Sequence, residues 1–400
     1  MDRSTQTAVV VGAGAAGLVS ALALRAAGAA VTIIAPARRA DPRTTALMDG
    51  SVHALEALGV WPLLRADAAP LRTLRLIDGT RRLLRAPETT FQAGEAGLAA
   101  FAWNVENERL NAALEAARAQ HEGIGRIEGT VAGIEAGADS VEVRLDDGRR
   151  VKARLVAAAD GRDSPVRTAL GIAVRSRSYP QVAVTATLAH ERPHNGVSTE
   201  FHTETGPFTL VPLSGERSSV VCVVTAKEAA ALMALDEAAF GLAMEKRGHS
   251  LLGRMRLTSG RGAFPLSSRT AAALAVPRVA LLGEAAHVLP PIGAQGLNLG
   301  LRDAATLAEL VADAVRGGGD IGAAALTEAY ARRRRADIDS RTLAVDLLNR
   351  SLLTDFLPVQ GLRGLGLWLF GRVRPLRHLA MREGLGPARD APRLLSGRPL

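Results

Sequence analysis

Short apolar runs separated by glycines organise the beginning of the chain. Residues 8–11 are continuously apolar, residues 15–27 are rich in Ala and Leu, and residues 31–34 are apolar again. A buried strand, a helix and a second buried strand in this order are typical of a parallel βαβ unit. Residues 279–282 are a further short apolar run that ends at a glycine, and they predict another strand of the same sheet.

The middle of the chain follows a different, two-residue period. In residues 129–157 apolar and polar positions alternate, as expected for antiparallel strands with one buried face. Asp147-Gly148 is a typical hairpin turn between two of these strands. The clearest later strands are predicted at 182–188, 208–212 and 219–225, followed by one helix at 226–248.

These patterns predict an α/β fold with two domains. A Rossmann-like nucleotide-binding domain is discontinuous, and a mostly antiparallel β-sheet domain is inserted into it. The predicted nucleotide-binding domain comprises residues 1–72, 97–178 and 268–345, the inserted substrate domain comprises residues 73–96 and 179–267, and residues 346–400 form a C-terminal helical segment.

Composition narrows the classes of function. With 48% hydrophobic residues the 400-residue chain can bury a large core, whereas 3% aromatic residues do not suit a base-stacking nucleic-acid binder. Cys222 is the single cysteine, and no Cys/His cluster has metal-ligand spacing, so we predict neither a disulfide nor a metal site. No apolar run reaches the roughly 18 residues of a membrane span, and a cytoplasmic protein is expected.

A glycine-rich motif follows the first predicted strand. Gly12, Gly14 and Gly17 form G-x-G-x-x-G with Ala15 and Ala16, and the motif opens the predicted helix. In this context the glycines permit a tight turn, close approach of a pyrophosphate and close packing of helix on strand, while the helix N-terminus faces the phosphates. A dinucleotide-binding site is therefore predicted.

One expected feature of such a site is missing. An acidic residue normally ends the second strand and binds the adenosine ribose, but Ala35 occupies that position. Arg38 and Arg39 follow, which leaves open an NADP site whose arginines hold a 2′-phosphate.

Two later motifs favour a flavin instead. Residues 159–167 read ADGRDSPVR and residues 283–298 read GEAAHVLPPIGAQGLN. With these three motifs in order, nearly the whole chain resembles the para-hydroxybenzoate hydroxylase family of flavin monooxygenases, and within it the ubiquinone-biosynthesis hydroxylases. Glu284 stands where that family usually has aspartate, and its carboxylate at a strand end can accept hydrogen bonds from ribitol hydroxyls. The helix after Gly293 can direct its N-terminal amides at the flavin ring.

The resemblance implies an FAD-dependent aromatic hydroxylase that uses NAD(P)H and O2 on a prenylated phenol of ubiquinone biosynthesis. The alternatives are a non-hydroxylating flavoprotein of the same fold, such as a prenyl reductase, and a non-catalytic partner in a quinone-synthesis assembly. The resemblance also places the backbone carbonyl of Pro291 beside the substrate. The predicted cofactor-binding residues are Gly12, Gly14, Ala15, Ala16, Gly17, Arg43, Asn107, Asp160, Glu284, Gly293, Gln295, Gly296, Leu297 and Asn298.

Arginines account for much of the formal net charge of +9. Residues 332–335 are four consecutive arginines, for which a solvated face is the default expectation. Residues 351–384 interleave Leu, Phe and Trp with five further arginines. That mixture suits either a terminal helix packed on the flavin domain or a peripheral surface on anionic lipid, and quinone-biosynthesis proteins are possible partners.

Overall fold

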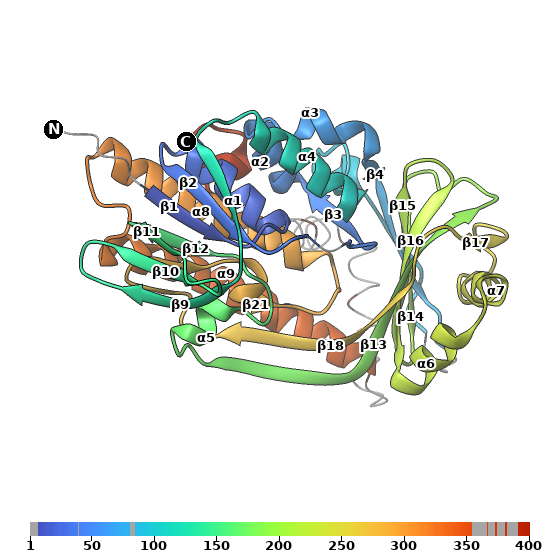
Figure 1. The fold of residues 1–400 in the computed structure, drawn as a ribbon. Helices are drawn as coiled ribbons and strands as arrows, with labels where there is room; N and C mark the ends of the chain where they lie inside the picture. Colours follow the sequence, from blue (N-terminus) through green and yellow to red (C-terminus); the bar gives the residue numbers. More distant parts are fainter. Residues whose placement is uncertain are drawn as a thin grey trace.

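The computed structural model describes residues 7–38, 40–80 and 85–353, residues 366, 373 and 381, and residues 391–400, with only the backbone described at 348–353. Two halves lie side by side, one mixed α/β and one built around a large sheet (Figure 1). Within the described residues, no helix combines the length and apolar composition needed to cross a bilayer.

A six-stranded sheet forms the centre of the first half. Its order is β19 (Ala275–Val276), β20 (Val279–Leu281), β12 (Leu155–Ala158), β1 (Thr7–Val11), β2 (Ala30–Ala35) and β8 (Ile124–Glu128). All pairs are parallel except β19 with β20, and β12 and β20 are fully buried. The predicted βαβ unit, with α1 (Ala15–Ala26) between β1 and β2, and the return of residues 279–282 to this sheet are confirmed.

Helices cover this sheet because their apolar sides join its core. Helix α1 packs against α8 (Gln295–Arg316) and α4 (Asn107–Ala119), and α8 packs against α9 (Ala324–Leu353). The glycines Gly317–Gly319 lie in the connection between α8 and α9. The remaining helices of this half are α2 (Asp49–Ala57), α3 (Trp61–Leu64), α5 (Pro165–Ala169) and the 3₁₀ turns η1 (Arg65–Asp67), η2 (Ala93–Ala96), η3 (Gly283–Ala285) and η4 (Arg393–Ser396).

Two small antiparallel sheets complete the first half. The antiparallel strands predicted within residues 129–157 are confirmed as β9 (Val131–Ala136), β10 (Val141–Leu145) and β11 (Arg150–Ala153). The end of that range is wrong, because Leu155–Ala158 form β12 of the parallel sheet and are buried on both faces. The other small sheet joins β3 (Thr44–Met48), β7 (Ala102–Glu106) and β4 (Ala69–Leu71).

A nine-stranded sheet dominates the second half. Its order is β21 (His287–Val288), β18 (Gly262–Ala271), β13 (Val174–His190), β16 (Arg217–Thr225), β15 (Gly206–Leu213), β14 (Val197–Thr203), β5 (Thr73–Asp78) and β6 (Thr89–Gln92), with β17 (Met255–Leu257) beside β13. The chain therefore enters this sheet three times, as β5 and β6, as β13 to β18, and finally as β21. The long strands β13 and β18 run from beneath the first half into the second (Figure 1).

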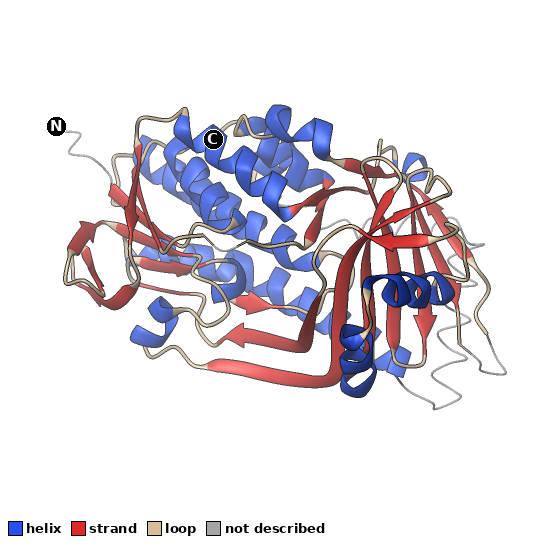
Figure 2. Cartoon of the chain, turned by 45° about the vertical axis from the view of Figure 1, so that its right-hand side comes forward, coloured by secondary structure: helices blue, strands red, loops and turns tan. Residues whose placement is uncertain are grey.

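The single helix predicted at 226–248 is wrong. Two helices, α6 (Ala226–Ala234) and α7 (Glu237–Arg247), are separated because Leu235 is extended and the Asp236 carboxylate caps α7 by accepting from the amide of Ala239 at 2.7 Å. Both helices lie on one face of the large sheet (Figure 2), where Phe240 and Met244 share a core with Phe208. Cys222 belongs to the same core, and burial raises the pKa of its thiol to about 11.

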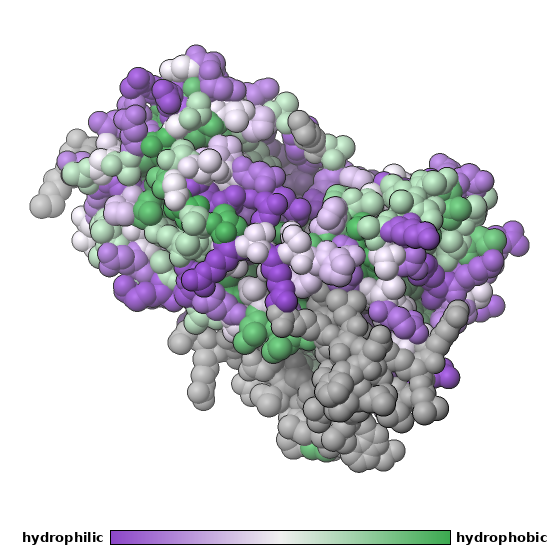
Figure 3. Space-filling model, turned by 90° about the horizontal axis from the view of Figure 1, so that it is seen from below, coloured by the Kyte–Doolittle hydropathy of each residue, from purple (hydrophilic) through white to green (hydrophobic). Residues whose placement is uncertain are grey.

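Seen from below, the described surface mixes polar and apolar residues over both halves, with a narrower waist between them (Figure 3). The run of four arginines at 332–335 is not simply a solvated face. Arg334 is buried, and its side chain points into the protein, whereas Arg332 and Arg333 are exposed and pair with Glu328 and Glu309.

Candidate functional site

The turn after β1 is built so that only glycine fits at two of its positions. Gly12 has φ +108°, and a Cβ there would lie 2.2 Å from the carbonyl oxygen of Ala159. A Cβ at Gly17 would lie 2.1 Å from the carbonyl oxygen of Gly12, so α1 packs directly on the turn. Both contacts are shorter than any side chain tolerates, which explains the motif as packing geometry.

The third motif glycine faces open space instead. A Cβ at Gly14 would have no neighbour within 4 Å, and Gly14 lines a large cavity together with Ala15 and Ala16. Helix α1 starts at Ala15 with no side chain capping its N-terminus. Its first-turn amides are therefore available to an anionic group, and this cradle fits a pyrophosphate.

The loop from β20 to α8 forms a second wall of the same cavity. Glu284 lies in the turn η3 just after β20, and its side chain is half exposed in the cavity. Gly293 and Ala294 both have left-handed backbone, with φ of +66° and +53°, and this double turn starts α8, again with no side-chain cap. Gln295, Gly296 and Leu297 in the first turn of α8 line the cavity, as does Pro291.

Asn298 holds this loop in place from outside the cavity lining. Its buried side chain accepts hydrogen bonds from the amide of Met48 at 2.9 Å and the hydroxyl of Ser51 at 2.7 Å. It donates to the carbonyls of Ala46 and Ala294 at 2.8 and 2.6 Å. The Asn298 side chain thus ties α8 to β3 and α2. Its oxygen and its nitrogen are both hydrogen-bonded within the protein, so its role here is to position the loop.

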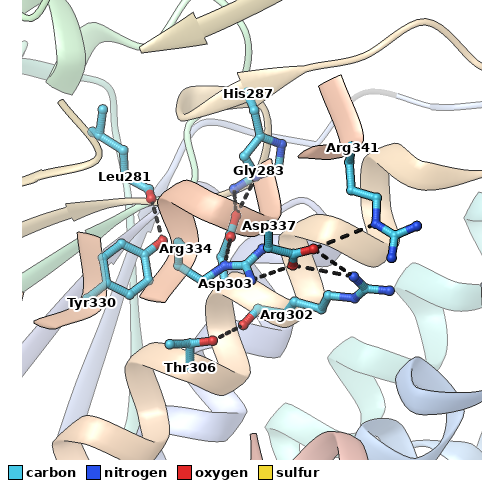
Figure 4. A network of polar contacts seen from close by, with 10 residues as sticks. All are labelled: Leu281, Gly283, His287, Arg302, Asp303, Thr306, Tyr330, Arg334, Asp337 and Arg341. Atoms are coloured by element: carbon cyan, nitrogen blue, oxygen red, sulfur yellow. Dashed lines mark hydrogen bonds and ion pairs between the residues drawn. The ribbon is translucent and has the colours of Figure 1, made fainter. Parts of the chain in front are cut away.

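A buried ionic network supports the loop from behind (Figure 4). The Asp303 carboxylate on α8 accepts from the amide of Gly283 at 2.9 Å, contacts Nε2 of His287 at 2.6 Å and accepts from Nε of Arg334 on α9 at 2.7 Å. Burial alone would raise the pKa of Asp303, but the charges of His287 and Arg334 hold it below its usual range. His287, in the flavin-type loop, therefore has a structural hydrogen-bonding role here.

The network continues along α9. Arg334 also donates to Asp337 at 2.6 Å, and Arg302 donates to the same carboxylate at 3.1 Å. The hydroxyl of Tyr330 donates to the carbonyl of Leu281 at 2.7 Å, and burial raises the pKa of this phenol. Helices α8 and α9 are thereby bonded to the strand and turn that present Glu284.

Arg43 and Asn107 meet at the cavity through a shared carboxylate. Asp41 accepts from Nε and Nη2 of Arg43 at 2.7 and 2.8 Å and from Nδ2 of Asn107 at 2.8 Å. Burial would raise the pKa of Asp41, but the bonds and charge of Arg43 lower it overall. The guanidinium of Arg43 lies over the ring of Phe264 in β18, 5.3 Å from its centroid, and so connects the two halves across the cavity.

Asp160 and Ala35 lie beside the cavity lining, not in it. Asp160 follows β12, its carboxylate accepts from the amide of Val166 at 3.0 Å, and burial raises its pKa. Its neighbours Gly161 and Arg162 line the cavity. Ala35 is buried at the end of β2, so no carboxylate stands at the usual ribose position of that strand.

The cavity has a volume of about 850 Å³ and lies between the glycine turn and α8 loop on one side and the large sheet on the other. Phe264, Pro265 and Leu266 of the sheet line it, whereas Phe208 packs on the opposite face of the sheet. Of the predicted site residues, the structure brings eleven together on this lining: Gly14, Ala15, Ala16, Arg43, Asn107, Glu284, Pro291, Gly293, Gln295, Gly296 and Leu297.

Sequence reasoning missed several polar residues of the sheet wall, three of which are bonded to one another. Glu200 and His202 on β14 and Thr209 on β15 line the cavity, and strand β14 was not predicted. The signal was present in residues 197–203, which read VSTEFHT. Their two-residue alternation puts Ser198, Glu200 and His202 on one face of a strand, but short polar strands are easily taken for loops.

A parallel sheet with a glycine turn, a second loop at a strand end and a large sheet across a common cavity define a two-domain dinucleotide-cofactor protein. The family model described as FAD binding domain matches residues 4–342. The chain belongs to this FAD-binding family, is a flavin-dependent monooxygenase, and uses FAD with NAD(P)H as its reductant. FAD, when bound, supplies the activation of O2.

Named relatives agree with this assignment. The chain is 34% identical to the ubiquinone hydroxylase UbiL of Rhodospirillum rubrum, over 98% of this chain and 93% of that protein. It is 30% identical to the 3-demethoxyubiquinol 3-hydroxylase of Escherichia coli, over 96% and 99%. The fold matches p-nitrophenol 4-monooxygenase from Pseudomonas putida with TM-score 0.78, 20% identity and coverage of 96% and 99%. HpxO of Klebsiella pneumoniae, complexed with FAD and uric acid, gives TM-score 0.78, 20% identity and coverage of 96% and 98%.

Proposed function

We propose that the protein hydroxylates the ring of a prenylated phenol on the route to ubiquinone. The observation that carries this proposal is one cavity lined on one side by the glycine turn and the β20–α8 loop, which together form the proposed flavin cradle, and on the other side by the large sheet. Its sheet side is mainly apolar, with Leu74, Leu76, Phe91 and Phe101 among its lining residues. An apolar lining of this kind suits an aromatic ring that carries an alkyl chain. The names of the two relatives give the substrate class.

In this proposal the chain's own residues have separate tasks. The amides of Gly14, Ala15 and Ala16 bind the pyrophosphate, and Glu284 accepts hydrogen bonds from the ribitol chain. Gly293, Gln295, Gly296 and Leu297 direct backbone amides at the flavin ring, and the carbonyl of Pro291 faces the substrate. Gly12 and Gly17 shape the turn, while Asn298 and Asp160 position the loops that carry these groups.

Arg43 and Asn107 are proposed to act beside the cofactor phosphates. Both side chains line the cavity and are held there by Asp41. We also propose the domain division of residues 1–72, 97–178 and 268–345 for FAD and 73–96 and 179–267 for the substrate, with residues 346–400 as a C-terminal segment. The strands β5 and β6 of the large sheet fall within residues 73–96, and β14 to β17 fall within residues 179–267, which supports this division.

Deletion of the gene, followed by mass spectrometry of the quinone precursors, tests the function directly. We expect a prenylated phenol one hydroxyl group short of the next intermediate to accumulate, and the intact gene to remove it. Purified protein should be yellow, oxidise NAD(P)H and yield hydroxylated product. Accumulation of a precursor with a less reduced prenyl chain would support a prenyl reductase instead, and an unchanged precursor pool would contradict both.

A further inference from the structure

A carboxylate and an imidazole lie side by side on the sheet wall of the cavity, among apolar residues and several hydroxyl side chains. Strand β14 presents Glu200 and His202 to the cavity, while Phe201 between them packs on the opposite face against Phe208, with ring centroids 6.0 Å apart. Both side chains therefore point inward because the strand alternates, and Phe201 fixes which face is which.

The pair is enclosed and internally bonded. Nε2 of His202 lies 2.9 Å from one Glu200 carboxylate oxygen, and the hydroxyl of Thr209 on β15 donates to the other at 3.2 Å. The side chains of His202 and Glu200 are 5% and 22% exposed. A carboxylate this enclosed needs hydrogen-bond donors, and each of its oxygens can accept more than one bond. Glu200 thus keeps acceptor capacity toward the cavity.

Apolar side chains on neighbouring strands flank Glu200, so this part of the wall suits a mainly apolar ligand that carries one polar group. Leu76 is its register partner on β5, and Val221 faces the cavity two strands away on β16. Two other carboxylates line the cavity within the described residues: Asp41 is bonded to Arg43 and Asn107, and Glu284 belongs to the flavin-cradle wall. Glu200 is therefore the carboxylate that the sheet offers to a substrate.

We propose that Glu200, held by His202 and Thr209, binds the phenolic hydroxyl of the substrate and takes its proton during the reaction. The inference rests on the proposed function. The O–H bond of the phenol breaks, its electron pair stays on the ring oxygen, and the proton passes to the Glu200–His202 pair. The resulting phenolate is a more electron-rich ring, and the step needs no additional oxidant or reductant.

Binding to the oxidised holoenzyme tests the recognition step without turnover. The probes are 2-prenylphenol and its methyl ether, in which a methyl group replaces the hydroxyl proton, and the readout is the perturbation of flavin absorbance. We expect Glu200→Gln to weaken phenol binding by roughly 10- to 100-fold, the range of a charge-assisted hydrogen bond, and to leave ether binding unchanged. Glu204→Gln removes the same charge from an exposed position of the same hairpin and should bind both probes like wild type.

A second measurement, the yield of hydrogen peroxide relative to hydroxylated product, tests the proton-transfer step. Glu200→Gln should still accept electrons from NAD(P)H, but a larger share of them should appear as hydrogen peroxide instead of hydroxylated product. His202→Gln and Thr209→Val should shift both readouts in the same direction by less, and they test the inference even if Glu200→Gln fails to fold.

The outcomes separate this inference from the proposed function. If the wild type binds and hydroxylates 2-prenylphenol while all three variants match it in binding selectivity and peroxide yield, the assignment of the pair is wrong and the proposed function stands. If the wild type itself binds neither probe, both are contradicted.

Discussion

Ala35 marks the point where the cofactor site departs from the usual dinucleotide pattern. The residue is buried at the end of β2, and its carbonyl accepts from the amide of Gly129 after β8. Its register partner on β8 is Glu128, which is exposed. An adenosine ribose bound at the end of β2 would therefore meet an alanine methyl where a carboxylate usually stands.

Restoring the carboxylate should tighten FAD binding. Ala35→Glu adds a charge-assisted acceptor for the ribose hydroxyls, worth on the order of 1.5–3 kcal/mol. Titration of the apoprotein with FAD measures the gain, and Ala35→Gln, with the same length and no charge, should gain less. Unchanged or weaker affinity in Ala35→Glu would mean that another group already binds the ribose.

Glu284 should be required to retain the flavin. Glu284→Ala removes an acceptor at the strand end and leaves ribitol hydroxyls without a partner in the cleft, at a cost of about 1–3 kcal/mol. The variant should purify folded but largely colourless, as judged by circular dichroism and by flavin absorbance per protein. Glu216→Ala, at an exposed turn of the large sheet, is the matched control and should stay yellow. A fully yellow Glu284→Ala protein would exclude the carboxylate as a ligand.

At the scale of elements, strongly patterned segments were predictable and weakly patterned ones were not. The buried strands β1, β2 and β20 follow from continuous apolar runs, and the hairpin of β10 and β11 follows from alternation and Asp147-Gly148. Strand β14 was not predicted because the residues on its cavity-facing side are polar, and so the strand lacks the apolar alternation that marks a half-buried strand. The break between α6 and α7 escaped because Asp236 as a cap is visible only once the turn is known.

The candidate site likewise has parts that the sequence predicts and parts that it does not. Local motifs identified both walls of the flavin cradle, since each is a contiguous loop at a strand end. The Asp303–Arg334 pair and the Glu200–His202–Thr209 group depend on elements that meet only in the folded chain. The two-residue spacing in the sequence puts Glu200 and His202 on one face of a strand, but it does not encode the contact of Glu200 with Thr209 or that of Asp303 with Arg334.

The α8–α9 network should contribute strongly to stability. Asp303→Asn removes the negative charge that pairs with buried Arg334 and should lower the free energy of unfolding by about 3 kcal/mol. This value is at the low end for a broken buried pair because Asp337 still contacts Arg334. Urea unfolding measures the loss. The control is Asp313→Asn on the same helix, whose exposed pairs with Arg316 and Arg393 should be worth about 0–1 kcal/mol.

The same network predicts a pH dependence with a defined sign. The pKa of Asp303 is lower in the folded protein than in the unfolded chain, so its contribution is fully present above the ordinary aspartate value of about 3.9 and is lost as pH falls below it. Between pH 6 and pH 3, wild type should therefore lose more stability than Asp303→Asn. Parallel curves for the two proteins, measured by urea unfolding at each pH, would contradict the depressed pKa.

At the scale of the whole molecule, one cavity is shared by two halves that β13 and β18 join. Arg43 over Phe264 adds a contact between them. A substrate ring bound at the sheet wall would meet the flavin cradle across this cavity, and its prenyl chain would need an apolar route. Phe91, Phe101 and Met381 form a small apolar cluster on the cavity lining, and Met381 comes from the C-terminal segment.

We propose that residues 351–384, which lie almost entirely outside the described residues, bind the surface of anionic membranes. The proposal is argued from sequence: apolar side chains and Arg363, Arg372, Arg374, Arg377 and Arg382 are interleaved there, and prenylated substrates partition into bilayers. We expect salt-sensitive flotation of the protein with anionic liposomes and none with neutral ones.

Changing Arg372, Arg374 and Arg377 to Gln together should weaken this binding by roughly a hundredfold, since each arginine near an anionic surface contributes about 1 kcal/mol. The matched control changes Arg144, Arg149 and Arg150, which are exposed on the β10–β11 hairpin, so that net charge falls equally at a site far along the chain. The control should float like wild type. If both triple variants lose flotation equally, net charge alone attracts the protein to lipid. If wild type does not float even at low salt, the arginines form a solvated face and the substrate reaches the cavity without membrane contact by this segment.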